Sequence, residues 1–295
     1  MSQPLVLDFD GSLTTLENSN VIDLQNWQET VRFGCGMKNW RALRQTLDAK
    51  MPREHSTVLM GSGDFHHISH LLIARCQCDT LFDVVVFDNH PDNMRFPFGI
   101  HCGSWVRHVA ALPNVCKVHV IGISSGDVSW RHAWENYLMP LYAGRVHYWT
   151  LGVDTRWARI AGLASRFHSF EQREELLTAF TAVLRNDDTP LYLSIDKDVL
   201  DASVAHTNWD QGHFLLEDIE RVMAGFDGRL VGSDITGEIS IHHYQTRWKR
   251  WLSAMDEQPV IAPEALAQWQ QEQLAVNRRL LASIDALSGY RARTE

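Results

Sequence analysis

The stretch DVVVFDNHPD at residues 83–92 carries three side chains whose types and spacing suit metal binding. Asp88, His90 and Asp92 alternate with other residues directly after the apolar run 84–87. A short continuous apolar run predicts a strand buried on both faces, as in a parallel sheet. The polar side chains would then emerge at the carboxyl end of that strand, where open α/β sheets hold their ligands. Carboxylates mixed with an imidazole suit Mn²⁺ or Zn²⁺ better than Ca²⁺.

A second pair of acids follows another apolar segment, in LYLSIDKDVLDAS at residues 191–203. Residues 191–195 predict a buried strand, and Asp196 and Asp198 come directly after it. Two carboxylates at one strand end repel each other unless a cation lies between them. We therefore expect Asp196 and Asp198 to bind a cation, whereas Asp201 is expected to fix the turn that follows.

Three histidines follow a glycine-containing turn in STVLMGSGDFHHISH at residues 56–70. Residues 57–60 predict a strand, and the glycines at 61 and 63 let the backbone approach a site closely. His66 and His70 are four residues apart at the start of a predicted helix, so both could reach one ion. His66, nearest the turn, is the candidate ligand, with His67 as the alternative.

Other candidate functional residues lie after later predicted strands. His101 follows the central motif by eleven residues, just before a predicted helix that begins at Ser104, and is a candidate proton shuttle. Asp234 and Glu238 are expected past the end of the last strand, within RLVGSDITGEIS at residues 229–240.

The elements that must position these residues alternate between strand and helix from residue 57 to 240. Further strands are predicted at 5–9, 117–124 and 145–151, and helices at 20–33, 38–50, 130–138, 171–184 and 215–226, with a long amphipathic C-terminal helix at about 263–287. This alternation predicts an α/β protein with three α/β/α layers around a mostly parallel sheet. No linker or repeat divides the chain, so residues 1–295 are expected to form a single domain.

Composition narrows the class of partner. The chain is 45% hydrophobic and has a formal net charge of −9, which argues against a nucleic-acid partner bound through phosphates. We expect no membrane partner, since no apolar run approaches the roughly 20 residues of a membrane span and the first residues lack a signal-peptide pattern. Five scattered cysteines indicate a reduced, cytoplasmic protein.

Taken together, the motifs resemble those of the ureohydrolase superfamily, which includes arginases, agmatinases and formiminoglutamases. The family pattern is a Gly-Gly-Asp-His turn, Asp-x-His-x-Asp, Asp-x-Asp and a late Glu, each at a strand end. Here the matching segments are GSGDFHH, DNHPD, SIDKDVLD and DITGE, in the same order. The resemblance covers residues 57–240 and implies the arginase-like fold.

The resemblance also implies a binuclear manganese site and a role for each matching residue. Asp88 and Asp196 would bridge two Mn²⁺ ions, with His66 and Asp92 on one ion and His90 and Asp198 on the other. A hydroxide between the ions would attack a guanidino or related C–N carbon of a small molecule. Asp92 would orient this nucleophile, His101 would shuttle protons, and Glu238 would hold the cationic group of the substrate. Asp210 is a second candidate for substrate binding.

The chain departs from the family pattern in four places. The segment AHTNWDQGH at residues 205–213 replaces a proline- and glycine-rich loop. Phe65 adds one residue to the first histidine motif, Ala202 replaces the proline after Asp201, and an apolar segment, MRFPFGIHCG at residues 94–103, replaces a substrate-binding loop. Arginine is therefore not the expected substrate. Relatives form trimers and hexamers, so a homo-oligomer is left open.

Two other functions remain as alternatives. The opening LVLDFDGSLT resembles the first motif of haloacid-dehalogenase-type phosphatases, in which Asp8 would be the nucleophile and Asp10 the general acid. That function would leave the Asp-x-His-x-Asp and Asp-x-Asp motifs unexplained. The second alternative is a metal-binding member of the fold without catalytic activity.

Overall fold

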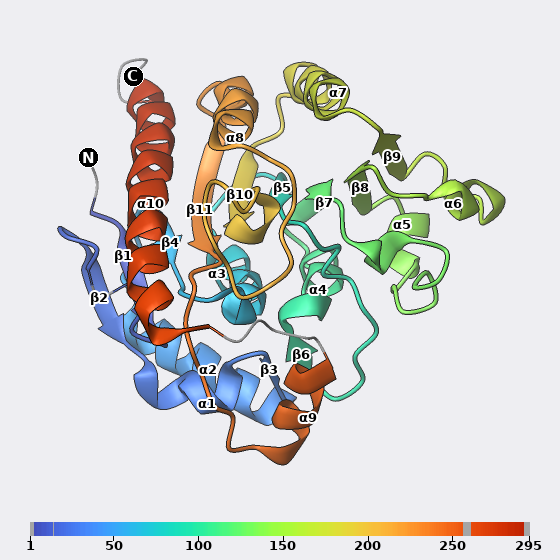
Figure 1. Ribbon diagram of the computed structural model, residues 1–295. Coiled ribbons are helices and arrows are strands. Elements are labelled where there is room, and N and C mark those ends of the chain that lie inside the picture. Colours follow the sequence, from blue (N-terminus) through green and yellow to red (C-terminus); the bar gives the residue numbers. More distant parts are fainter. Residues whose placement is uncertain (1–2, 14, 256–260, 292–295) are drawn as a thin grey trace.

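The computed structural model describes residues 3–13, 15–255 and 261–291, and within these ranges the chain forms a nine-stranded sheet (Figure 1). The strand order is β2-β1-β4-β11-β10-β5-β7-β8-β9, and every neighbouring pair is parallel. The strands are β1 (Leu5–Asp8), β2 (Asn20–Asp23), β4 (Val58–Leu59), β5 (Phe82–Phe87), β7 (Val115–Ile123), β8 (Val146–Leu151), β9 (Phe167–Phe170), β10 (Leu191–Asp196) and β11 (Leu230–Thr236). Two short strands, β3 (Gly34–Cys35) and β6 (Ile100–His101), form a separate antiparallel pair.

Helices cover both faces of the sheet, which gives the predicted three layers (Figure 1). They are α1 (Gln28–Val31), α2 (Met37–Lys50), α3 (Ser69–Arg75), α4 (Val106–Val109), α5 (Met139–Tyr142), α6 (Arg156–Ile160), α7 (Arg173–Arg185), α8 (Leu216–Met223), α9 (Arg247–Met255) and α10 (Pro263–Arg291). Short 3₁₀ turns follow several strands, among them η2 (Gly63–Ile68), η3 (Cys102–Ser104), η4 (Gly126–Val128) and η5 (Lys197–Val199).

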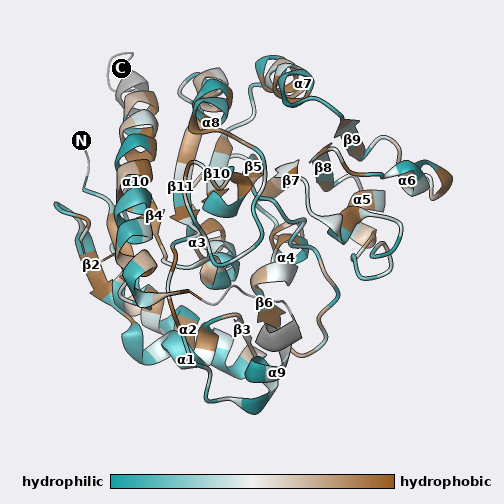
Figure 2. Cartoon of the chain, in the orientation of Figure 1, coloured by the Kyte–Doolittle hydropathy of each residue, from teal (hydrophilic) through white to brown (hydrophobic). Residues whose placement is uncertain are grey.

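Strand β5 belongs to two hydrophobic cores because successive side chains point to opposite faces of a sheet. Val84 and Val86 pack into the core beneath α2, α3 and α4. Val85 and Phe87 pack into the core beneath α7, α8 and α10. Figure 2 shows the hydrophobic residues gathered on β5, β10 and β11 in the middle of the sheet. Burial on both faces explains why these central strands are continuous apolar runs.

The α/β class and the parallel sheet are confirmed, but several predicted elements are wrong in detail. The predicted helix at 20–33 begins instead with edge strand β2, and only residues 25–31 are helical. The predicted helix at 130–138 consists of turns, and its tryptophans Trp130 and Trp134 are 76% and 70% exposed. Both tryptophans lie on a surface loop and not on the buried face of a helix. Strand β9 and helices α6 and α9 were not predicted, and α10 extends to Arg291.

Parallel pairing brings the carboxyl ends of β4, β5, β10 and β11 to one edge of the sheet. The segments that leave these four neighbouring strands are the histidine turn, the central motif, the paired acids and the late acid. Among the helices within the described ranges, none is long and apolar enough to cross a membrane.

Candidate metal centre

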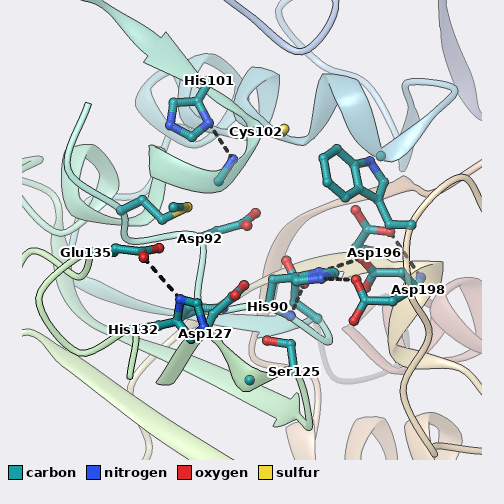
Figure 3. Close-up of a pocket in the computed structure, with 18 of the residues that line it drawn as sticks. His90, Asp92, His101, Cys102, Ser125, Asp127, His132, Glu135, Asp196 and Asp198 are labelled. Atoms are coloured by element: carbon teal, nitrogen blue, oxygen red, sulfur yellow. Dashed lines mark hydrogen bonds and ion pairs between the residues drawn. The ribbon is translucent and has the colours of Figure 1, made fainter. Parts of the chain in front are cut away.

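Two overlapping groups of potential metal ligands lie at this edge of the sheet. The first is His66, Asp88 and Asp196, and the second is Asp88, His90 and Asp198. Within each group, one ligand atom from each residue lies within 4.8 Å of the others. Asp88 belongs to both groups, so one carboxylate could contact two ions. Figure 3 shows His90, Asp196 and Asp198 close together, with Asp92 nearby.

His66 presents one ring nitrogen to three carboxylates. Its Nδ1 atom lies 3.1 Å from Oδ2 of Asp88, 3.2 Å from Oδ2 of Asp92 and 3.3 Å from Oδ2 of Asp196. The other nitrogen, Nε2, lies 3.0 Å from Oγ of Ser194, whose hydroxyl donates to Asp234 at 2.7 Å. A hydrogen bond at Nε2 fixes the ring orientation and leaves Nδ1 free to bind a metal.

His90 is oriented in a similar way by two carboxylates. Its Nδ1 atom lies 2.9 Å from Oδ2 of Asp198 and 3.5 Å from Oδ1 of Asp88. Its Nε2 atom lies 2.8 Å from Oδ1 of Asp210, which sits in an exposed loop, and this hydrogen bond lowers the pKa of Asp210. The side-chain amide of Asn89 donates to the other oxygen of Asp210 at 3.1 Å. Asp210 therefore holds the ring with Nδ1 directed toward Asp88 and Asp198.

Local backbone geometry aims the acids at the same point. Asp92 has a left-handed backbone with φ of 45°, and the indole of Trp105 donates to its Oδ2 at 2.6 Å. The carboxylate of Asp196 accepts from the backbone N–H of Asp198 at 3.1 Å, which caps the turn η5. The backbone N–H of Asn89 in turn donates to Asp198 at 3.0 Å.

The crowded carboxylates are electrostatically unfavourable without a cation. Burial, and then the neighbouring Asp88 carboxylate, raise the pKa of Asp92 to about 7 and that of Asp198 to about 7. Burial and the charge of Asp198 also raise the pKa of Asp196. In addition, Nδ1 of His66 and Oδ2 of Asp88 are buried without a hydrogen-bond partner among the residues that the structure describes. Buried polar atoms without partners, in a mixed nitrogen and oxygen set, fit a divalent transition-metal ion such as Mn²⁺.

Four residues of the ligand groups, Asp88, His90, Asp196 and Asp198, line a cavity of about 570 Å³. Aromatic rings of Phe33, Phe96 and Trp209 form part of its wall. Polar side chains line it as well, including Asp127, His132 and Glu135, which lie on the segment after β7 and are labelled in Figure 3. The cavity therefore offers both stacking surfaces and charged groups to a small molecule.

His101 also lines this cavity, as Figure 3 shows. Its ring stacks on Phe33, with centroids 5.8 Å apart, and meets Phe96 edge-on at 4.4 Å. The backbone N–H of Gly103 donates to its Nδ1 at 3.1 Å, so the neutral ring carries its proton on Nε2. Burial, followed by the nearby charge of Arg107, lowers the pKa of His101 to about 3. The ring is therefore neutral at physiological pH.

Some predicted residues lie outside the ligand groups. His67 stacks on Trp40 with centroids 5.4 Å apart, and His70 lies between Trp40 and His108, so neither belongs to the two ligand groups. Asp234 lies within β11 rather than past its end and accepts from the hydroxyls of Ser69, Ser194 and Tyr192. Glu238 is not among the described residues that line the cavity.

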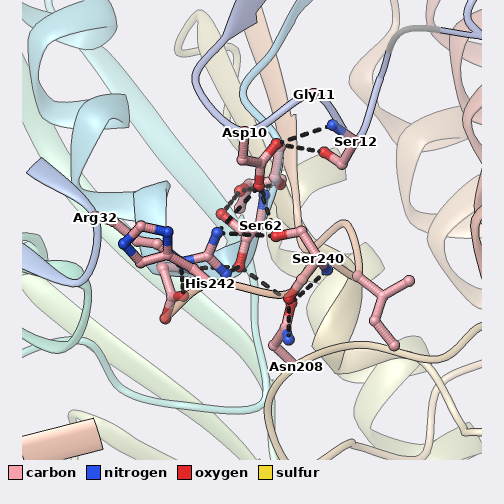
Figure 4. Close-up of polar contacts among 12 residues, drawn as sticks. Asp10, Gly11, Ser12, Arg32, Ser62, Asn208, Ser240 and His242 are labelled. Carbon is pink, nitrogen blue, oxygen red and sulfur yellow. Dashed lines mark hydrogen bonds and ion pairs between the residues drawn. The ribbon is translucent and has the colours of Figure 1, made fainter. Parts of the chain in front are cut away.

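Of the two acids of the alternative phosphatase motif, Asp10 lies in a buried polar cluster with Arg32 and Ser240 (Figure 4), whereas Asp8 has separate partners. Asp8 accepts from the backbone N–H of Gly11 at 2.8 Å, and Asp10 accepts from the hydroxyl of Ser240 at 2.7 Å. Arg32 is buried between Asp10, at 3.5 Å, and Asp64, at 2.7 Å. These contacts join the first strand to the histidine turn, so both acids have structural partners.

Several residues at the site were missed by the sequence analysis. Ser194 precedes Asp196 by two residues on β10, so strand alternation placed both on one face and offered a signal. Trp105 and Asn89 contact the acids through side-chain and backbone donors that no motif marks. Asp127, His132 and Glu135 lie on a loop whose path depends on tertiary contacts, for example the donation from Asn136 to the carbonyl of Asp127 at 2.8 Å.

Comparisons with known proteins agree with the fold. The sequence model of the arginase family matches residues 5–237, and the chain belongs to this family. An uncharacterized protein of Thermotoga maritima is 30% identical over 189 residues, which are 64% of this chain and 60% of that protein.

Solved structures of ureohydrolases share the fold. The agmatine ureohydrolase of Thermoplasma volcanium is similar with a TM-score of 0.55 at 15% identity, over 99% of this chain and 92% of that one. The formimidoylglutamase of Bacillus subtilis has a TM-score of 0.53 at 16% identity, over 99% of this chain and 88% of that one. The proclavaminate amidino hydrolase of Streptomyces clavuligerus has a TM-score of 0.52 at 16% identity, over 97% of this chain and 93% of that one. At these identities the similarity establishes the fold alone.

Proposed function

We propose that this protein is a hydrolase that cleaves a linear C–N bond of a guanidino or related small molecule with the help of two manganese ions. The observation that carries this proposal is the pair of ligand groups that share Asp88 at the wall of a 570 Å³ cavity. Membership of the arginase family supports it. Two proteins with similar structures are an agmatine ureohydrolase and a proclavaminate amidino hydrolase, whose names describe the same class of chemistry.

The ligands would divide between two ions as follows. His66 and Asp92 would hold one ion and His90 and Asp198 the other, and Asp88, a member of both ligand groups, and Asp196 would supply further carboxylate ligands. A pair of divalent ions lowers the pKa of bound water and so supplies a nucleophile near neutral pH. Ser194 and Asp210 would hold the imidazole rings of His66 and His90 with Nδ1 directed inward.

His101 is proposed to move protons between the reacting group and solvent. Its neutral ring carries a proton on Nε2 and lies on the cavity wall between two aromatic rings. The Nε2–H of the neutral ring can donate a hydrogen bond to a leaving amine, and a proton passed on from Nε2 must be replaced by one taken up at Nδ1, the nitrogen that here accepts from Gly103. Asp92, whose Oδ2 accepts from Trp105, is proposed to orient the nucleophile. A cytoplasmic location and a homo-oligomeric assembly stay predictions.

The test is a screen for urea, ammonia and formamide release by manganese-loaded protein. The panel contains agmatine, arginine, formiminoglutamate and guanidinoacetate, each also incubated with the metal-stripped protein and with an Asp88→Asn variant. Manganese-dependent release from at least one compound, absent in the variant, is expected.

Binding of two manganese ions without any release would instead identify a metal-binding protein without this activity. Hydrolysis of p-nitrophenyl phosphate that is lost in Asp8→Asn, with Asp88→Asn unaffected, would identify the phosphatase.

A further inference from the structure

A closed cluster of polar side chains lies behind the metal ligands, on the side of the C-terminal helix α10. The ammonium of Lys197 donates to the carboxylate of Glu238 and, at 2.9 Å, to Oδ1 of Asn277. The amide of Asn277 donates to the same Glu238 oxygen at 2.6 Å. All three side chains are buried, with Lys197 0% and Glu238 2% exposed. The cluster therefore satisfies its own charges without solvent.

Lys197 connects this cluster directly to two proposed ligands. It stands between Asp196 and Asp198 in the chain and begins the turn η5, which carries Asp198. Because its neighbours face the ligand groups while its own side chain reaches α10, the position of Lys197 sets the backbone from which both acids project.

The residue before Glu238 explains why this acid faces α10. Gly237 has a left-handed backbone with φ of 91°, and a Cβ there would lie 2.5 Å from Oδ1 of Asp196. The backbone of Gly237 thus packs against a proposed ligand. The side chain of Glu238 contacts Lys197 and Asn277.

Helix α10 fixes this arrangement through two residues one turn apart. Gln273 donates to the carbonyl of Gly237 at 3.0 Å and to that of His206 at 2.6 Å. Asn277 completes the pair of Lys197 and Glu238. Both side chains are buried on the face of α10 that covers the strand ends. The C-terminal helix is therefore in contact with the segments that leave β10 and β11.

We propose that Lys197 is a positioning residue for the flanking ligands Asp196 and Asp198, with Glu238 as its counter-ion rather than as a group that holds the substrate. The inference rests on the proposed function, since it assigns the two aspartates to the metal site. It also means that the cationic part of a substrate is recognised by groups other than Glu238.

The test is a double-substitution cycle on Lys197→Met and Glu238→Gln, made separately and together in the full-length protein. Manganese affinity is measured well below the lowest Tm, thermal unfolding is recorded, and agmatine binding is measured by calorimetry. The control is Glu220→Gln, which removes a partly exposed ion pair between Arg279 of α10 and α8, away from the ligands.

Each single substitution is expected to weaken manganese binding at least tenfold and to lower Tm, because it leaves a buried charge without its partner. The double variant is expected to recover most of the manganese affinity and most of the Tm. Neither of the two buried charges remains in it, and the amide oxygen introduced by Glu238→Gln can still accept from Asn277. The Glu220→Gln control is expected to bind manganese like the wild type. If the single variants do not fold, the double variant alone decides. A manganese affinity close to that of the wild type supports the inference, and loss of this affinity overturns it.

A different pattern would overturn the inference. If Glu238→Gln leaves Tm and manganese affinity unchanged and weakens only agmatine binding, Glu238 is a substrate group. Independent effects of the two substitutions on manganese affinity would also refute the positioning role while leaving the proposed function intact. A wild-type protein that binds no manganese refutes the proposed function first, and the inference falls with it.

Discussion

Nδ1 of His66 and Oδ2 of Asp88 lie 3.1 Å apart, both buried, and neither has a hydrogen-bond partner among the residues that the structure describes. Leaving a buried polar atom without a partner costs about 1–3 kcal/mol. The two atoms belong to the segments that leave β4 and β5, and β11 and β10 lie between these strands in the sheet, so only the fold brings the atoms together. A cation bound between them would remove this cost.

Manganese is therefore expected to stabilise the folded protein. Protein stripped of metal should gain several degrees in Tm when Mn²⁺ is added, because a ligand at 100 times its Kd adds about 2.7 kcal/mol to the free energy of unfolding. Differential scanning calorimetry of the stripped and reloaded protein measures this. A Tm that does not respond to Mn²⁺ in the wild type, or that responds equally in Asp88→Asn, would contradict the prediction.

Asp210→Asn should weaken the binding of one metal ion without abolishing it. Asp210 holds Nε2 of His90 at 2.8 Å, and loss of such an orienting carboxylate typically costs 10- to 100-fold in metal affinity. Titration with Mn²⁺ by isothermal calorimetry should show one weakened and one unchanged site. Asp154→Asn, which removes an exposed acid paired with Arg156, is the matched control and should leave both sites unchanged.

Gly237→Ala should destabilise the protein more than Gly228→Ala. Both glycines have left-handed backbones, with φ of 91° and 75°, so both substitutions introduce backbone strain of about 1–3 kcal/mol. Only at Gly237 would the new Cβ also lie 2.5 Å from Asp196, whereas at Gly228 no heavy atom of the described residues lies within 4 Å. Urea unfolding of both variants measures the difference. Equal losses of stability would show that the backbone of Gly237 is not held against Asp196.

The pH dependence of stability should report the buried histidine His70. Burial, and then the neighbouring His108, lower the pKa of His70 to about 4, against 6.5 for the unfolded chain. The unfolded state therefore binds more protons between these values, and the contribution of His70 to stability is lost as the pH falls from about 6.5 to 4. In His70→Gln this loss is absent, so the Tm difference between wild type and variant should shift in favour of the variant on acidification. A difference that is constant from pH 7 to 4 would contradict the pKa assignment.

The centre of the fold was predictable because its strands carry a strong local signal. Residues 84–87 and 191–195 are continuous apolar runs, each followed by alternating acids, and the rule that parallel strands end at one edge places Asp88 and Asp196 together. The periphery lacked such a signal. Strand β2 is an edge strand in which only Ile22 is buried, and its four residues gave no alternation that could be distinguished from a helix.

The site was predictable as a set of residue types but not in its supporting contacts. Asp-x-His-x-Asp and Asp-x-Asp mark their residues directly, whereas the hydrogen bonds from Trp105 to Asp92 and from His90 to Asp210 join segments 13 and 120 residues apart. The direction of the Glu238 side chain depends on the left-handed backbone of Gly237 and on a helix 39 residues further along the chain. No local pattern carries that information.

The most direct test of the central claim is the metal content of the purified protein, measured by elemental analysis after loading with manganese. The proposed site predicts close to two manganese equivalents per chain in the wild type and loss of this metal in the double variant His90→Ala, Asp196→Ala, with a folded circular-dichroism spectrum as the control. A single magnesium equivalent, or manganese that survives the double substitution, would contradict the binuclear site.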